Sequence, residues 1–192
     1  MVIGAAGQLG RALCETLRDA RHEVTEGVHG APEPGQRRLD LETPDALVAQ
    51  LRRLQPAWIL IAGAFCNVDG AETDSTRCLR VNAEGPAAVA AYAQAAGCRV
   101  VYYSTDQVFD GARESYRETD PVHPVNCYAQ SKAQGEAAMR SQAPTAHLIL
   151  RTAWLYGPDA ARRNFALRLV DQLGEGRQVR VPSDQLGCPT YT

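Results

Sequence analysis

The chain opens with the stretch Met1-Val2-Ile3-Gly4-Ala5-Ala6-Gly7-Gln8-Leu9-Gly10, in which three apolar residues run into a turn with glycine at every third position. Residues 11–17 follow with apolar side chains at helical spacing. The stretch therefore predicts a strand, a glycine turn and a helix. Such a turn lets backbone N–H groups and the positive end of a helix approach a pyrophosphate. A glycine-rich turn with a purely structural role is the alternative interpretation.

Apolar runs and helical patterns alternate along the rest of the chain. Further strands are expected at 22–28, 57–64, 99–104, 147–151 and 179–181, and further helices at 43–54, 74–96, 126–139 and 164–173. Thr43 and Asn126 stand where helix N-caps are expected, and Gly97 stands at a C-cap position. The alternation, without an internal repeat, predicts an α/β fold with a doubly wound parallel sheet.

Composition limits the class of protein. The chain has 192 residues, of which 45% are hydrophobic and 22% charged, as expected for one soluble globular domain. The net charge is −2 and the arginines are dispersed, so we expect no nucleic-acid partner. The six cysteines form no C-x-x-C pair, so no metal site is expected. No run of 18 apolar residues occurs, so we expect a cytoplasmic protein without a membrane partner.

Small and polar residues follow the expected strands. The third strand ends in Ala62-Gly63-Ala64 and the fourth in Ser104-Thr105-Asp106. The carboxyl ends of parallel strands meet at one edge of the sheet, where cofactors lie in doubly wound folds. These segments are therefore predicted to share an edge with the glycine turn. A plain helix cap or turn is the alternative for the polar segment.

Residues that could select the cofactor are less clear. A dinucleotide fold places a ribose-reading residue after the second strand, where this chain has His29 and Gly30. Neither an acid nor an arginine stands there, which leaves the choice between NADH and NADPH open. Farther on, Asp40 and Leu41 could contact an adenine edge, or Asp40 could be a turn carboxylate.

Tyr128 and Lys132 are predicted to lie one helical turn apart on one face. Lys132 is the one lysine among 20 basic residues. An ammonium and a guanidinium are not interchangeable where a cation must sit against a hydroxyl and change its pKa. The alternative is an ordinary exposed lysine on a helix.

A family resemblance ties these features together. The chain is similar to the extended short-chain dehydrogenase/reductases, and among them to the dTDP-4-dehydrorhamnose reductases. The resemblance rests on the glycine turn, the Tyr128/Lys132 pair and three further motifs: Ser104-Thr105-Asp106-Gln107-Val108-Phe109-Asp110-Gly111, Arg151-Thr152-Ala153-Trp154-Leu155-Tyr156-Gly157 and Asp184-Gln185-Leu186-Gly187-Cys188-Pro189-Thr190. The chain departs from the family pattern at Gly63, Phe65 and Gln107. These differences affect the identity of the sugar substrate more than the type of reaction.

The resemblance implies a Rossmann domain that uses NADPH or NADH to reduce the 4-keto group of a nucleotide sugar. It implies pyrophosphate contacts from the turn, adenine contacts from Asp40 and Leu41, and cofactor contacts from Ala62, Gly63 and Ala64. It also implies that catalysis is carried out by Thr105, Tyr128 and Lys132, of which Tyr128 and Lys132 also contact the cofactor. The sugar would be contacted by Thr105, Asp106 and Trp154. Residues 185–190 would form a loop that closes over the substrate. The turn residues concerned are Gly4, Gly7, Gln8, Leu9 and Gly10.

Members of this family are generally longer. Residues 1–192 are therefore expected to be a Rossmann domain whose segment 152–192 leads into a truncated substrate lobe, in a fragment. Some members bind Mg²⁺ through acids of the missing part, and a homodimer is compatible with the resemblance.

In the implied mechanism, Tyr128 donates its proton to the sugar oxygen, and Lys132 shifts the tyrosine pKa downward. Two alternatives remain. One is a non-catalytic regulatory subunit like the beta subunit of methionine adenosyltransferase. The presence of Thr105, Tyr128 and Lys132 argues against this alternative, because such a subunit needs no proton donor. The other is a nucleotide-sugar epimerase or dehydratase; dehydratases usually carry an acidic pair after the threonine, whereas here Gln107 follows Asp106.

Overall fold

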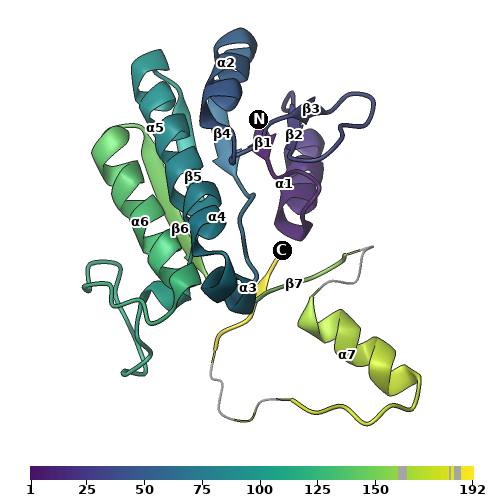
Figure 1. The fold of residues 1–192 in the computed structure, drawn as a ribbon. Coiled ribbons are helices and arrows are strands. Elements are labelled where there is room, and N and C mark those ends of the chain that lie inside the picture. The colour runs from purple at the N-terminus through teal and green to yellow at the C-terminus, as the bar shows by residue number, and fades with distance from the viewer. Residues whose placement is uncertain (160–163, 182, 184–186) are drawn as a thin grey trace. The chain divides into compact units, whose positions relative to one another are not determined.

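The structure, a computed structural model, describes residues 1–159, 164–181, 183 and 187–192 (Figure 1). The chain divides into two compact units, Met1–Arg151 and Thr152–Thr192.

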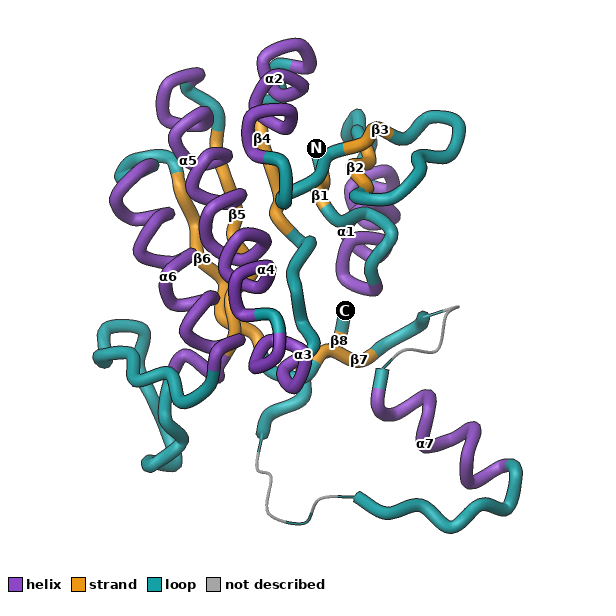
Figure 2. The backbone as a smooth tube through the Cα atoms, viewed as in Figure 1, coloured by secondary structure: helices purple, strands orange, loops and turns teal. Residues whose placement is uncertain are grey.

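A six-stranded parallel sheet forms the centre of the first unit (Figure 2). Its strand order is β3-β2-β1-β4-β5-β6, the order of a dinucleotide-binding doubly wound sheet. The predicted fold class is thereby confirmed. The strands are β1 (Val2–Ile3), β2 (Glu26–Val28), β3 (Arg37–Arg38), β4 (Trp58–Ile61), β5 (Arg99–Thr105) and β6 (His147–Thr152).

Helices connect these strands, and one lies in the second unit (Figure 1). They are α1 (Gln8–Asp19), α2 (Pro44–Leu54), α3 (Val68–Thr73), α4 (Ser75–Leu79), α5 (Gly85–Ala96), α6 (Cys127–Gln142) and α7 (Phe165–Gly174). A π-helical turn at Arg80–Glu84 joins α4 to α5, and a 3-10 turn at Asp106–Val108 follows β5. In the second unit, β7 (Leu155–Tyr156) pairs in parallel with β8 (Thr190–Tyr191).

Alternating strand residues build a core on each side of the sheet. Ile59 and Ile61 of β4 pack with Leu51 of α2 and Val89 of α5, whereas Leu60 packs on the α1 side. Burying these side chains on both faces is the main force that favours the layered arrangement. Over β6 the α1 side is less covered, because Leu148 and Leu150 are exposed.

Several local predictions need correction. Residues 179–181 form no strand, and the two-stranded sheet of the second unit uses Thr190–Tyr191 instead. The expected helix 74–96 contains the π-helical turn, and α3 was not predicted because it spans only six residues. Thr43 makes no side-chain cap bond to α2, since its hydroxyl donates to the Asp40 carbonyl at 3.3 Å. Asn126 and Gly97 cap their helices as predicted.

Candidate active site

The glycine turn is packed so tightly that only glycine fits at two positions. Gly4 has a φ of +89°, and a Cβ on it would lie 2.4 Å from the backbone nitrogen of Gly63. A Cβ on Gly10 would lie 2.1 Å from the Gly4 carbonyl oxygen. The turn therefore lies directly against the end of β4, and α1 begins at Gln8 with Gly7 as its N-cap. Open backbone of this kind at a helix N-terminus suits a pyrophosphate.

A cavity of about 120 Å³ at the carboxyl edge of the sheet brings five of the predicted cofactor residues together. Its lining includes Gly4, Asp40, Leu41, Gly63 and Ala64. The Asp40 carboxylate also accepts a hydrogen bond from the backbone N–H of Glu42 at 3.0 Å, so it is a turn carboxylate as well as a cavity residue.

Ala62 differs from its neighbours, because it packs into the core on the α1 side. Gln8 and Leu9 lie in the first turn of α1.

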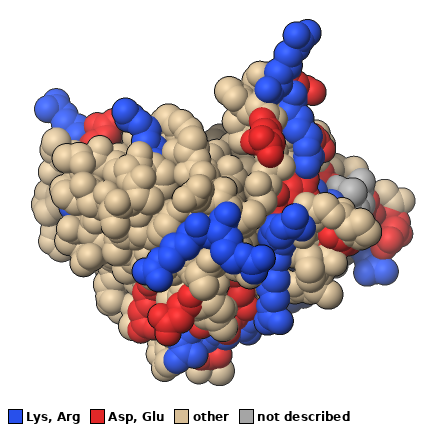
Figure 3. Space-filling view, turned by 90° about the horizontal axis from the view of Figure 1, so that it is seen from above, with Lys and Arg blue, Asp and Glu red and all other residues tan. Residues whose placement is uncertain are grey.

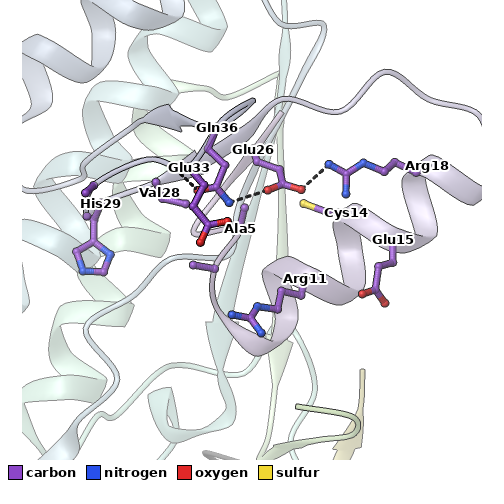
Figure 4. A pocket seen from close by; sticks show the side chains of 13 residues that line it. Ala5, Arg11, Cys14, Glu15, Arg18, Glu26, Val28, His29, Glu33 and Gln36 are labelled. Carbon is purple, nitrogen blue, oxygen red and sulfur yellow. Dashed lines mark hydrogen bonds and ion pairs between the residues drawn. The ribbon is translucent and has the colours of Figure 1, made fainter. Parts of the chain in front are cut away.

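A larger cavity of about 360 Å³ lies beside α1, between that helix and the loop after β2 (Figure 4). The Glu26 carboxylate, on β2, accepts hydrogen bonds from Arg18 and from Gln36. Those bonds lower the pKa of Glu26, with Arg18 the larger cause. His29 lines both cavities, so the two cavities adjoin at this residue. His29 is also the position at which a dinucleotide fold is expected to carry a residue that contacts the ribose.

Lys132 is buried, with 2% of its surface exposed. Its Nζ donates a hydrogen bond to the Tyr103 carbonyl at 2.6 Å and lies 4.0 Å from the centre of the Tyr102 ring. The exposed-lysine alternative is therefore wrong. Burial lowers the pKa of Lys132 to about 7, with the Glu136 carboxylate acting in the opposite direction.

Tyr128 lies one turn before Lys132 on α6 and close to Thr105, at the end of β5. Burial raises the pKa of Tyr128 to about 12; the nearby Cys66 adds to the rise, and a hydrogen bond with the Thr105 hydroxyl opposes it. The expected downward shift by Lys132 is not what the protein's own groups produce. The reason is that the lysine is directed to the Tyr103 carbonyl and the Tyr102 ring.

The polar segment at the end of β5 serves two purposes. Thr105 caps the 3-10 turn by accepting from the Gln107 N–H at 3.2 Å, and its hydroxyl donates to Asp106 at 3.1 Å. Ser104 instead is buried and donates to Glu136 at 2.7 Å. The cap interpretation of this segment is therefore confirmed at Thr105, and its role in a site stays a prediction.

Asn82 was missed by the sequence analysis. It is buried in the π-helical turn, accepts from the Phe65 N–H at 2.9 Å, and donates to the Phe65 carbonyl at 3.0 Å and to the Ser131 hydroxyl at 2.9 Å. It therefore fastens the segment after β4 to α6, beside Lys132. An asparagine between Val81 and Ala83 in a predicted helix was the available signal, since such side chains often bond to backbone.

We expect Lys132→Met to change how stability depends on pH. The folded pKa of Lys132, about 7, lies below its ordinary value of 10.5. Between these values the unfolded state binds more protons, so the contribution of this lysine to stability rises with pH. The unfolding free energy of wild type minus that of the variant should rise by up to about 1.4 kcal/mol per pH unit. Urea unfolding of both proteins between about pH 7 and about pH 9 measures this. A difference that does not vary with pH would contradict it.

The second unit contains the remaining predicted site residues. Trp154 is 49% exposed, and its carbonyl accepts from the Thr190 N–H at 2.8 Å. Its indole lies near Gly187, on which a Cβ would be 3.3 Å from the ring. Gln185, at the start of the expected closing loop, lies outside the described residues.

The described part of the chain shows no group of three or more His, Cys, Asp or Glu side chains arranged to hold a metal ion. None of the helices it contains is both long and apolar enough to cross a membrane. On the face shown in Figure 3, Lys and Arg side chains lie beside Asp and Glu, as expected for dispersed charges.

Comparison with known proteins gives matches over the whole chain. The model of the RmlD substrate binding domain matches residues 1–192. A dTDP-4-dehydrorhamnose reductase of Salmonella typhimurium is 34% identical over 99% of this chain. A probable dTDP-4,6-dihydroxy-2-methyloxan-3-one 4-ketoreductase of Streptomyces antibioticus is 36% identical over 100% of it. The chain spans 62% of the length of each of these two relatives.

Solved structures agree with these matches. A dTDP-4-dehydrorhamnose reductase of Clostridium acetobutylicum superimposes with a TM-score of 0.87 and 32% identity, covering 99% of this chain and 64% of that one. The Bacillus anthracis reductase in complex with NADP gives a TM-score of 0.84 and 33% identity, covering 99% and 65%.

Proposed function

The chain belongs to the RmlD substrate binding domain family, and on that premise we propose that the protein is an NAD(P)H-dependent reductase of a nucleotide sugar. The proposed reaction converts the 4-keto group of dTDP-4-dehydrorhamnose to the hydroxyl of dTDP-rhamnose. The observation that supports it most is the grouping of Thr105, Tyr128 and the buried Lys132 at the same sheet edge as the glycine turn. We also propose a cytoplasmic location and a homodimer.

The residues of the sheet edge fit a dinucleotide. Gly4 and Gly10 leave room that a Cβ would fill, next to backbone N–H groups at the start of α1. Asp40, Leu41, Gly63 and Ala64 line the adjoining cavity, where the adenosine part would lie. When bound, NAD(P)H supplies the hydride for the sugar C4.

The chain's own groups account for the proton. Tyr128 gives its phenolic proton to the C4 oxygen as the carbonyl becomes a hydroxyl, and Thr105 holds that oxygen by a hydrogen bond. With a pKa of about 12, Tyr128 is protonated at neutral pH and so is ready to act as an acid. Lys132 binds the nicotinamide ribose in this proposal. Asp106 and Trp154 contact the sugar in this proposal.

The test is turnover by the full-length protein. We expect oxidation of NADPH or NADH, followed by nicotinamide absorbance, only when dTDP-4-dehydrorhamnose is present, with dTDP-rhamnose as product. Cofactor binding without oxidation would favour the regulatory subunit instead. A changed sugar with the cofactor returned in its original redox state would favour an epimerase or dehydratase.

A further inference from the structure

Glu136 is a completely buried carboxylate that the proposed mechanism does not use. It lies on α6 one turn after Lys132 and two turns after Tyr128, on the same face. Burying a carboxylate is costly unless it is fully paired. The groups around the Glu136 carboxylate must therefore compensate its charge.

Four hydrogen bonds reach this carboxylate from three elements. Arg151 of β6 binds it with two nitrogens, Nε at 2.8 Å and Nη2 at 2.6 Å. Ser104 of β5 donates at 2.7 Å, and Arg140 of α6 donates at 2.9 Å. A two-nitrogen arginine fork fixes orientation as well as charge. One side chain thus joins the ends of β5 and β6 to the helix that bears Tyr128 and Lys132.

Three consecutive β5 residues meet α6 in this way. The Tyr103 carbonyl accepts from Lys132 and the Ser104 hydroxyl donates to Glu136, while the Thr105 hydroxyl acts to lower the pKa of Tyr128. The distance between Thr105 and Tyr128 therefore depends on how β5 is held against α6. The Ser104–Glu136 bond is the contact between β5 and α6 that adjoins Thr105.

The charge of Glu136 also bears on Lys132. Burial acts to raise the pKa of Glu136, but hydrogen bonds from Arg151 and Ser104 hold it below its usual value, so the carboxylate is ionised at neutral pH. Other groups that face the Lys132 ammonium come from three further segments: Cys66 after β4, Cys78 of α4 and Tyr102 of β5.

We propose that Glu136 is a positioning residue for the reaction: its carboxylate holds the end of β5 against α6 and places a negative charge opposite the Lys132 ammonium. This rests on the proposed function, which puts Lys132 at the cofactor and Thr105 and Tyr128 at the sugar.

The first test reads cofactor binding against pH in the full-length protein. The Kd of NADPH is measured by nicotinamide fluorescence for wild type, Glu136→Gln and the charge-retaining control Glu136→Asp. The pH above which binding weakens should fall by about one unit in the Gln variant and stay in place in the Asp variant. An unmoved pH dependence in the Gln variant, or an equal weakening at every pH, would overturn the electrostatic role.

The second test removes only the link to β5. Ser104→Ala keeps the charge of Glu136 and its arginine fork, so we expect kcat to fall about tenfold with the pH dependence of binding unmoved. An unchanged kcat would overturn the positioning role, and this variant decides if Glu136→Gln fails to fold. Cofactor binding needs no sugar, so a wild type that binds NADPH without turnover would count against the proposed function and leave the first test intact.

Discussion

Tyr128→Phe in the full-length protein is expected to lower kcat by about 10²–10⁴-fold, the usual contribution of a positioned general acid. The variant keeps the ring but removes the only atom of this side chain that can carry a proton to the sugar oxygen. Lys132 bonds to the Tyr103 carbonyl rather than to Tyr128, so the Kd of NAD(P)H should stay within about twofold. Steady-state kinetics and fluorescence titration measure the two quantities.

Tyr92→Phe is the matched control. It also removes one phenolic hydroxyl, which donates to the Leu51 carbonyl at 2.9 Å between α5 and α2. Its loss should cost about 1 kcal/mol of stability and leave kcat unchanged. If Tyr128→Phe retained more than about a tenth of the wild-type kcat, Tyr128 would not be the proton donor.

The fold was predictable because its signals are local. A strand, a glycine turn and a helix at the N-terminus, followed by apolar strands of suitable length, lead to a parallel sheet whose carboxyl edge collects the loops. The grouping of Thr105 with Tyr128 came from the family resemblance; in the structure Thr105 ends β5 and Tyr128 lies in the first turn of α6.

The parts that sequence did not predict depend on contacts between distant segments. In the π-helical turn, Asn82 bonds to Phe65 and Ser131, which lie far away in the chain. The burial of Glu136 depends on Arg151, which comes from another strand. The four-residue spacing predicted that Lys132 lies near Tyr128. The Nζ of Lys132, however, bonds to the Tyr103 carbonyl on β5, and no sequence pattern in α6 predicts that contact.

Gly10→Ala is expected to weaken NAD(P)H binding by about 10–100-fold, since overpacking by one methyl group costs about 1–3 kcal/mol. The new Cβ would lie 2.1 Å from the Gly4 carbonyl oxygen and 2.8 Å from the Ala5 Cα. These are backbone atoms, and the same carbonyl accepts from the Gly7 N–H at 3.0 Å, so the turn cannot yield without losing that bond. The first turn of α1 must then move away from Gly4. Its N–H groups would no longer converge where the pyrophosphate is proposed to bind.

Gly174→Ala serves as the comparison, because a Cβ on this glycine at the end of α7 would meet nothing within 4 Å. It adds the same methyl group and should leave the Kd of the cofactor unchanged. Fluorescence titration with NADPH gives both values, and circular dichroism on heating shows whether each variant is folded at the temperature used. A folded Gly10→Ala protein that binds NADPH as tightly as wild type would show that the turn does not hold the pyrophosphate. The glycines would then be required only for the close packing of α1 against the ends of β1 and β4.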